Sequence, residues 1–252
     1  MGANTGFTAA CVLGALSLSL GAANAAEITI LANQGAMPGV RELATAFEAQ
    51  TGHSVIVVRE VDETLERRVR DGSADLVTGN PGNIEVFVND GSVVPGSVTP
   101  FVLAELGISV QAGAANPDIS TVESYQAALL AAESIGFSRG CSGTNAAAGI
   151  ERLGLTQQLQ DKITRTESGP VTAYLARGEI EFGIQQTNIM VDVPGTDFVG
   201  PVPGYLNVAC QSDIGVLTAS QEPDVAREMI EFMISPEAAP LLRRTHVEPF
   251  SQ

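Results

Sequence analysis

The chain has 252 residues, which is enough for one large domain or two interlocked lobes. Hydrophobic residues make up 44% of it and charged residues 17%, a composition that excludes a disordered chain and a polytopic membrane protein. The 29 acidic residues outnumber the 13 basic ones, and the net charge of −16 excludes nucleic acid as a partner because it repels a phosphate backbone. Three cysteines and two histidines are too few for a Cys/His zinc site, so we expect no metal and no cofactor.

The N-terminal segment has the features of an export signal. Residues 7–26 carry no charge, and Ala23-Asn24-Ala25 supplies the small residues that a signal peptidase requires. The apolar part, about a dozen residues, is shorter than the ~20 needed to span a bilayer. We therefore predict a signal peptide over residues 1–25 and a periplasmic mature chain, with a buried first helix as the alternative. In that compartment Cys141 and Cys210 are candidates for a disulfide.

The first half of the mature chain alternates between strand and helix patterns. The β-rich run at the start, a short loop, a helix and a second β-rich run form a β-α-β unit, and its short connections predict parallel strands. An apolar extended stretch over residues 101–111 is long enough to pass between two lobes. The predicted strands are residues 27–32, 54–58 and 74–78, and the predicted helices are residues 40–50, 62–71 and 83–91.

The pattern starts again in the second half of the chain and indicates a second α/β lobe. A second crossing is expected near residues 207–217. We predict that residues 26–105 and 212–252 form lobe 1 and that residues 106–211 form lobe 2. The predicted strands are residues 134–137, 181–186 and 213–217, and the predicted helices are residues 121–132, 145–153, 171–177, 223–233 and 236–243.

Five segments of the mature chain occur in the order known from one family. Residues 28–52 end in the pattern Glu-Leu-Ala-x-x-Phe-Glu-x-x-Thr-Gly, and the other segments are residues 72–77, 91–97, 176–184 and 232–238. In these segments the chain resembles the periplasmic molybdate-binding proteins, which are type II solute-binding proteins of ABC transporters. The resemblance implies an α/β, two-lobed type II periplasmic binding protein fold with the ligand cleft between the lobes. It also implies a permease as partner, and we expect a monomer.

The loops that bind the oxyanion in this family are altered here. After the first strand the family places a serine that donates to the oxyanion, whereas this chain has Asn33, Gln34 and Gly35. After the second strand a Ser-Gly pair is replaced by residues 60–64, whose three carboxylates oppose a dianion. The tyrosine often found after the later Gly-Ile strand corresponds to Gln186. These differences predict a ligand other than molybdate.

A small-residue loop over residues 138–144 leads into a predicted helix. The N-terminus of a helix exposes unpaired N–H groups and a partial positive charge, so such a loop binds an anionic oxygen without a lysine. Arg139 adds a planar guanidinium suited to a carboxylate, and the alternative is a solvent-facing arginine on an ordinary turn. Cys141 in this loop is a candidate nucleophile, although packing or a disulfide is favoured because neither histidine is near it in sequence.

Two further segments supply candidate ligand-binding groups. Val171 and Thr172 begin a helix whose amides are expected to face the cleft, unless it is a plain helix start. Gln186, with Thr187 as the weaker candidate, ends a strand at the edge where open parallel sheets bind their ligands, unless the turn is internally satisfied. The predicted ligand-binding residues are Asn33, Gln34, Gly35, Ser138, Arg139, Gly140, Cys141, Ser142, Val171, Thr172, Gln186 and Thr187.

Amides, hydroxyls and one guanidinium suit carboxylates better than a compact tetrahedral oxyanion. We therefore expect a periplasmic binding protein that captures a di- or tricarboxylate for transport. The family resemblance also implies an alternative, because some relatives are aconitate isomerases, which move a double bond by proton transfer. In that case Asp62 or Glu63 is the expected acid/base. His53 and His246 fall in none of the candidate loops, so a Ser-His-Asp triad is not indicated.

Overall fold

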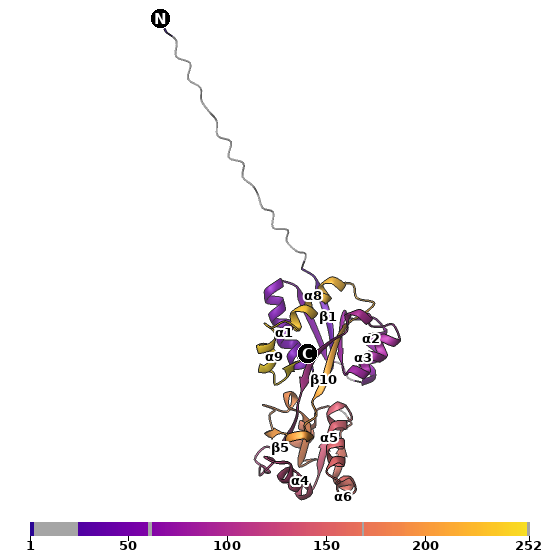
Figure 1. Cartoon of the computed structure of the whole chain (residues 1–252), viewed down its shortest axis with the longest axis vertical. Helices are drawn as coiled ribbons and strands as arrows, with labels where there is room; N and C mark the ends of the chain where they lie inside the picture. Colours follow the sequence, from indigo (N-terminus) through magenta and orange to yellow (C-terminus); the bar gives the residue numbers. More distant parts are fainter. Residues whose placement is uncertain (3–24, 60–61, 168, 251–252) are drawn as a thin grey trace.

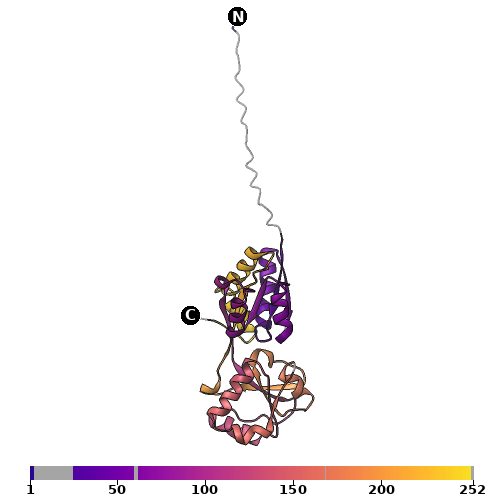
Figure 2. The ribbon, with the colours of Figure 1, turned by 90° about the vertical axis from the view of Figure 1, so that its right-hand side faces the viewer.

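The computed structural model describes residues 1–2, 25–59, 62–167 and 169–250. The predicted signal peptide, residues 1–25, lies almost entirely outside these residues. Within them, no helix has the length and apolar character needed to cross a membrane. Figures 1 and 2 show two lobes stacked along the longest axis of the molecule, each with helices around its own sheet.

The strands are β1 Glu27–Ala32, β2 Ser54–Arg59, β3 Leu76–Gly79, β4 Thr99–Ala104, β5 Leu106–Gln111, β6 Ile135–Phe137, β7 Ile163–Arg165, β8 Phe182–Gln186, β9 Thr196–Pro201, β10 Cys210–Val216 and β11 Glu248–Pro249. The α-helices are α1 Met37–Thr51, α2 Asp62–Arg70, α3 Pro81–Asn89, α4 Val122–Ala131, α5 Cys141–Arg152, α6 Thr156–Leu159, α7 Val171–Ala176, α8 Pro223–Met233 and α9 Ala239–Arg244. Short 3-10 helices cover η1 Pro95–Ser97, η2 Gln160–Lys162, η3 Thr187–Ile189 and η4 Gly204–Leu206.

Lobe 1 is built on a six-stranded sheet with the strand order β11-β4-β10-β3-β1-β2. Strand β1 pairs in parallel with β2 and β3, as the β-α-β pattern predicts. Strand β10 runs antiparallel between β3 and β4. The carboxyl ends of β1 and β3 therefore lie at one edge of the sheet. The loops that follow these two strands line the cavity described below.

Lobe 2 is built on the sheet β7-β6-β8-β5-β9. Its central strands β6 and β8 are parallel, with β7 parallel to β6 at the edge, while β5 runs antiparallel between β8 and β9. The carboxyl ends of β6, β7 and β8 lie together at the edge that faces lobe 1. This is the edge at which open parallel sheets bind their ligands.

Two chain crossings join the lobes. The first is a single residue, Glu105, between β4 of lobe 1 and β5 of lobe 2, and the second runs from the end of β9 to β10. The crossings lie side by side, because the Leu106 N–H donates to Asn207 Oδ1 at 2.9 Å and the Val202 N–H donates to the Leu106 carbonyl at 2.9 Å. The predicted extended stretch over residues 101–111 is thus two strands in two different sheets.

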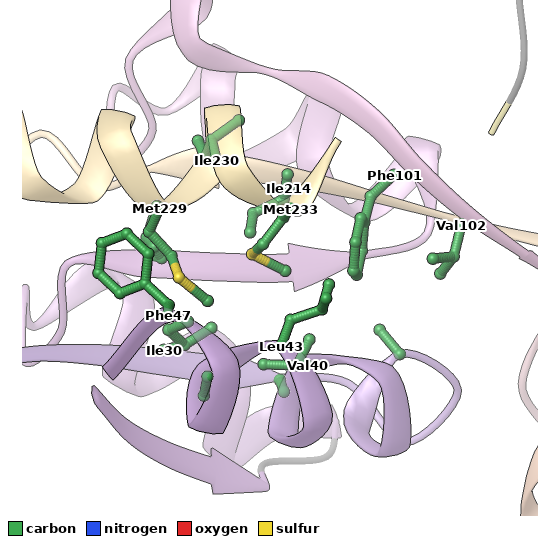
Figure 3. Close-up of a cluster of buried hydrophobic side chains, with 14 of the residues drawn as sticks. Ile30, Val40, Leu43, Phe47, Phe101, Val102, Ile214, Met229, Ile230 and Met233 are labelled. Atoms are coloured by element: carbon green, nitrogen blue, oxygen red, sulfur yellow. The ribbon is translucent and has the colours of Figure 1, made fainter. Parts of the chain in front are cut away.

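The core of lobe 1 explains why residues 37–51 form a helix. Val40, Leu43 and Phe47 recur at helical spacing and are buried on the face that meets the sheet and α8. Figure 3 shows these side chains opposite Met229 and Met233 of α8. Burying a side chain as large as Phe47, which is 1% exposed, stabilises the fold by about 3 kcal/mol.

Several element boundaries differ from the sequence predictions. Helix α5 begins at Cys141 instead of residue 145, so part of the predicted small-residue loop is its first turn. Helix α1 begins three residues earlier than predicted because Pro38 is accommodated in its first turn. The last helix, predicted over residues 236–243, is α9 at Ala239–Arg244. Strands β7 and β9 were not predicted.

Candidate functional site

A cavity of about 300 Å³ lies between the two lobes. Its lining has a single cation, Arg139, and a single carboxylate, Glu167, among the residues that the structure describes. The remaining lining is neutral and mostly polar. Lobe 1 contributes Asn33, Gln34, Gly35, Leu65, Asn80 and Asn83, and lobe 2 contributes Ser138, Arg139, Gly140, Cys141, Ser142, Thr166, Glu167, Gly169, Gln185 and Gln186.

In lobe 1 the cavity wall is formed by the loops after β1 and β3. The side-chain amide of Asn33 is hydrogen-bonded within lobe 1. Its Nδ2 donates to Ser212 Oγ at 3.1 Å, and its Oδ1 accepts from Thr78 Oγ1 at 2.7 Å. These bonds tie the loop after β1 to β3 and β10. Asn80 is the N-cap of α3 but its side chain makes no cap hydrogen bond. Asn80 and Asn83 both line the cavity, so the start of α3, with no side-chain cap, lies at the cavity wall.

In lobe 2 the cavity wall is formed by the start of α5. The N-cap is Gly140, no side chain caps the helix, and no acidic residue occurs in its first turn. The hydroxyls of Ser138 and Ser142 lie 3.2 Å apart on the same wall. An uncapped helix start with a partial positive charge and two hydroxyl groups is a good binding surface for an anionic oxygen.

The two charged residues of the lining form a weak ion pair. Arg139 Nη2 lies 3.7 Å from Glu167 Oε1, and the side chains are 69% and 85% exposed. An exposed pair at this distance contributes little to stability, about 0–1 kcal/mol. The Arg139 guanidinium is therefore able to exchange this carboxylate for one on a ligand.

A disulfide anchors the start of α5. Cys141 is bonded to Cys210, the first residue of β10, with the two Cα atoms 6.0 Å apart. Asn145, one turn further along α5, donates from Nδ2 to the Val208 carbonyl at 2.9 Å. Both contacts attach the cavity wall of lobe 2 to the second chain crossing. The Cys141 thiol is consumed in this bond, so the predicted alternative of a cysteine nucleophile is wrong.

The lobes touch directly beside the cavity. Asn188 Nδ2 of lobe 2 donates to the Gly35 carbonyl of lobe 1 at 2.6 Å. A Cβ atom at position 35 would lie 2.3 Å from Gln186 Nε2, so the absence of a side chain at Gly35 permits this approach. The structure thus has the lobes in contact across the cleft.

The sequence of residues 28–248 matches the family model of the bacterial extracellular solute-binding proteins. The chain belongs to this family. An aconitate isomerase from Pseudomonas sp is 28% identical over 248 residues, which cover 94% of this chain and 95% of the relative.

Solved structures of the same fold include anion-binding proteins. The periplasmic molybdate-binding protein of Azotobacter vinelandii superposes with a TM-score of 0.74 at 17% identity, covering 89% of this chain and all of that one. A sulfate-binding protein from Mycobacterium tuberculosis has a TM-score of 0.70 at 20% identity, covering 90% of this chain and 88% of its own. The two-lobed periplasmic binding protein fold and the resemblance to molybdate-binding proteins are confirmed.

In this solute-binding protein, most of the predicted ligand-binding residues gather at one cavity. The predicted residues that line it are Asn33, Gln34, Gly35, Ser138, Arg139, Gly140, Cys141, Ser142 and Gln186.

Three predicted residues do not line the cavity. The Val171 N–H donates to Gln185 Oε1 at 2.8 Å, so this helix start is capped from within the lobe. Thr172 is 1% exposed, in the first turn of the same helix. Thr187 is half-buried, and its hydroxyl oxygen is buried where it would lie 2.8 Å from a Cβ atom at Gly107.

The predicted acid/base residues, Asp62 and Glu63, are the first two residues of α2, and their side chains lie outside the described part of the structure.

The cavity also has lining residues that the sequence analysis did not select. Asn80 and Asn83 come from the start of α3, and Thr166 follows the short strand β7. An Asn before Pro81 at the end of a buried strand is a signal that could have identified the first of these. Thr166 has no such local signal.

Proposed function

We propose that this protein is a periplasmic solute-binding protein whose cleft captures a small organic anion with two or three carboxylates and delivers it to an ABC permease. The observation that carries the proposal is the composition of the cavity lining: amides, hydroxyls and helix starts from both lobes around a single guanidinium. The hydrogen-bond donors are divided between the walls of lobe 1 and lobe 2. A small metabolite with a planar carboxylate at each end can bind donors on both walls.

Electrostatics supports an anion in spite of the net charge of −16. Helices α3 and α5 start at the cavity, and neither has a side-chain cap hydrogen bond or an acidic residue in its first turn. Each such helix start favours an anion by about 0.3–1 kcal/mol at an exposed site, and by up to about 2 kcal/mol where the site is partly buried. The two helix starts and Arg139 offset the repulsion that the acidic surface exerts on an approaching anion.

The size of the cavity also supports a small metabolite. Its volume of about 300 Å³ lies at the lower end of the ~300–1,000 Å³ typical of ligand sites. The proteins of the same fold have different oxyanions in their names, molybdate and sulfate, so the fold alone does not select the ligand. The selection must come from the lining, and here the lining favours carboxylates.

Isothermal titration calorimetry of the mature chain tests this proposal. The ligands are citrate, cis- and trans-aconitate, succinate and malate, with molybdate, sulfate and phosphate as the comparison set. We expect saturable heat from at least one carboxylate and weaker or no heat from the inorganic ions. Binding of molybdate or sulfate alone would contradict the proposal.

A second candidate function is isomerisation of aconitate, which the full-length similarity to the Pseudomonas enzyme favours. The reaction needs one group that removes a proton from the allylic carbon and returns a proton at the other end of the shifted double bond. Among the lining residues that the structure describes, Glu167 is the available carboxylate, and Asp62 and Glu63 stay as predicted alternatives. Arg139 and the N–H groups of α5 would stabilise the dienolate-like charge.

Proton NMR of cis-aconitate in deuterated buffer distinguishes the two functions. An isomerase produces trans-aconitate and places deuterium at the carbon that is reprotonated. A transport protein leaves the ligand unchanged and unlabelled. If turnover occurs, the variants Glu167→Gln, Asp62→Asn and Glu63→Gln identify the acid/base, because only its loss stops deuterium incorporation.

A further inference from the structure

Arg165, the last residue of β7, is fixed against the loop that carries Arg139. Its Nη1 donates to the Ser138 carbonyl at 3.0 Å, and its guanidinium carbon lies 4.3 Å from the centre of the Phe137 ring. Although Arg165 is exposed, the ring contact and the hydrogen bond to the carbonyl orient its planar guanidinium. Arg165 does not itself line the cavity, but Ser138 does.

The space around Gly143 shows that Arg165 and the Ser138 carbonyl lie close to the first turn of α5. A Cβ atom at position 143 would lie 1.6 Å from the Ser138 carbonyl oxygen and 3.0 Å from Arg165 Nη1. The first turn of α5, the Ser138 carbonyl and the Arg165 guanidinium are therefore in direct contact. The Ser138 carbonyl oxygen accepts a hydrogen bond from Arg165. Its negative dipole end is therefore not directed at an anion in the cavity.

Arg165 also adds positive charge next to Arg139. Burial and then repulsion by Arg139 lower the pKa of Arg165, which remains charged at neutral pH. Among the residues that the structure describes, no carboxylate forms an ion pair with Arg165, and Arg139 has only the exposed Glu167. Although the chain has a net charge of −16, its own carboxylates therefore neutralise these two neighbouring cations poorly.

We propose that Arg165 is a specificity-determining residue of the anion site: it positions the Ser138 loop and, together with Arg139, makes the site prefer trianionic tricarboxylates to dianionic dicarboxylates. This inference rests on the proposed binding of organic anions. Its physical basis is that the attraction of a fixed charge grows in proportion to the charge of the ligand.

Charge-removing and charge-conserving variants test the proposal. Arg165→Met removes the charge and keeps an apolar side chain over Phe137, whereas Arg165→Lys keeps the charge and loses the planar group. The matched control is Arg152→Met, which removes the same charge from the last turn of α5, at the end of the helix opposite the loop. Affinities for citrate and for succinate are measured by calorimetry at about pH 8, where every carboxyl group is ionised.

We expect Arg165→Met to weaken citrate binding about tenfold and succinate binding about fivefold, because the lost attraction scales with ligand charge. The preference for citrate over succinate then falls about twofold, and added salt reduces this difference. Arg165→Lys weakens both ligands but keeps the preference. Arg152→Met leaves both affinities and the preference within error of the unmodified protein.

Three results would overturn the proposal. If Arg165→Met binds both ligands as Arg152→Met does, Arg165 has no role in the site. If Arg165→Met weakens both ligands by the same factor, the role is structural and the charge preference is wrong, while the proposed function stands. If the unmodified protein binds neither citrate nor any other carboxylate, this inference and the proposed function both fail.

Discussion

Helices α4 and α5 both belong to lobe 2 but begin in opposite ways. Helix α4 has a full capping box, in which Thr121 Oγ1 accepts from the Ser124 N–H at 3.1 Å and Ser124 Oγ accepts from the Thr121 N–H at 3.0 Å. It also carries Glu123 in its first turn. Helix α5 has Gly140 as its N-cap, with no side-chain cap and no acidic residue in its first turn, and its start lines the cavity.

The contrast shows how the fold separates stability from binding. A capping box contributes about 1 kcal/mol by satisfying N–H groups that the helix leaves unpaired, and α4 uses this device at a position away from the cavity. Helix α5 has no capping box, so the N–H groups of its first turn are left for a ligand. Its start is held instead by distant parts of the chain, through the Cys141–Cys210 disulfide and the contact between Arg165 and Ser138.

The largest expected effect comes from removing the disulfide. We expect the double variant Cys141→Ala/Cys210→Ala to lower the free energy of unfolding by about 2–4 kcal/mol, because the bond closes a loop between residues 69 apart in the sequence. Denaturant unfolding measures this change. A phosphine reductant should destabilise the unmodified protein similarly and leave the double variant unaffected. An unchanged unfolding midpoint would show that α5 is not held by this bond.

A smaller effect is expected from the two glycines of α5. Gly143→Ala places a methyl group against the Ser138 carbonyl, and we expect a loss of about 2–3 kcal/mol in thermal or denaturant unfolding. Gly149→Ala is the matched control, because its nearest neighbours are 4.0 Å away. It should stabilise the helix by about 0.5–1 kcal/mol. Equal effects from both variants would mean that the close contact at Gly143 does not exist.

The smallest change in stability comes from giving α5 a cap like that of α4. Gly140 has φ −77° and ψ −162°, and a Cβ atom there meets nothing closer than Ser138 Oγ at 3.8 Å. Gly140→Asp should therefore stabilise the protein by a few tenths of a kcal/mol. The same carboxylate should weaken anion binding at least about tenfold, because it occupies the N–H groups and repels the ligand.

Thr121→Ala is the control for the capping experiment. It removes the cap of α4 and should lower stability by about 1 kcal/mol while the affinity for trans-aconitate stays the same. Unchanged affinity in Gly140→Asp would contradict the assignment of the α5 start as an anion-binding surface.

The sequence was most informative where one face of an element is buried. The periodic apolar residues of α1 and α8 and the β-rich runs of β1 and β2 predicted those elements, because burial against a core imposes a regular spacing. The strand ends and helix starts that follow from this pattern account for most of the cavity lining. Their gathering at one edge of each sheet is a consequence of the parallel strands.

Features that depend on contacts between distant segments were not predictable. The start of α5 reads as a loop because Cys, Ser, Gly and Thr have low helix propensity, and tertiary contacts override that preference. Strand β7 is three residues long and lies at the edge of its sheet, next to β6, so no local period reveals it. The place of Arg165 beside Ser138 follows from that pairing, and the bond between Asn188 and Gly35 joins residues 153 apart.

The most direct test of the central claim is an amide NMR titration of the mature chain with trans-aconitate. The account predicts saturable shifts of the backbone amides at Gly140, Cys141 and Ser142, together with those that line the lobe 1 wall at Gln34 and Asn83. The amides at the start of α4 should not move. Shifts confined to α4 or to the outer surface, with the amides at the start of α5 unchanged, would contradict the claim that the cleft binds an organic anion.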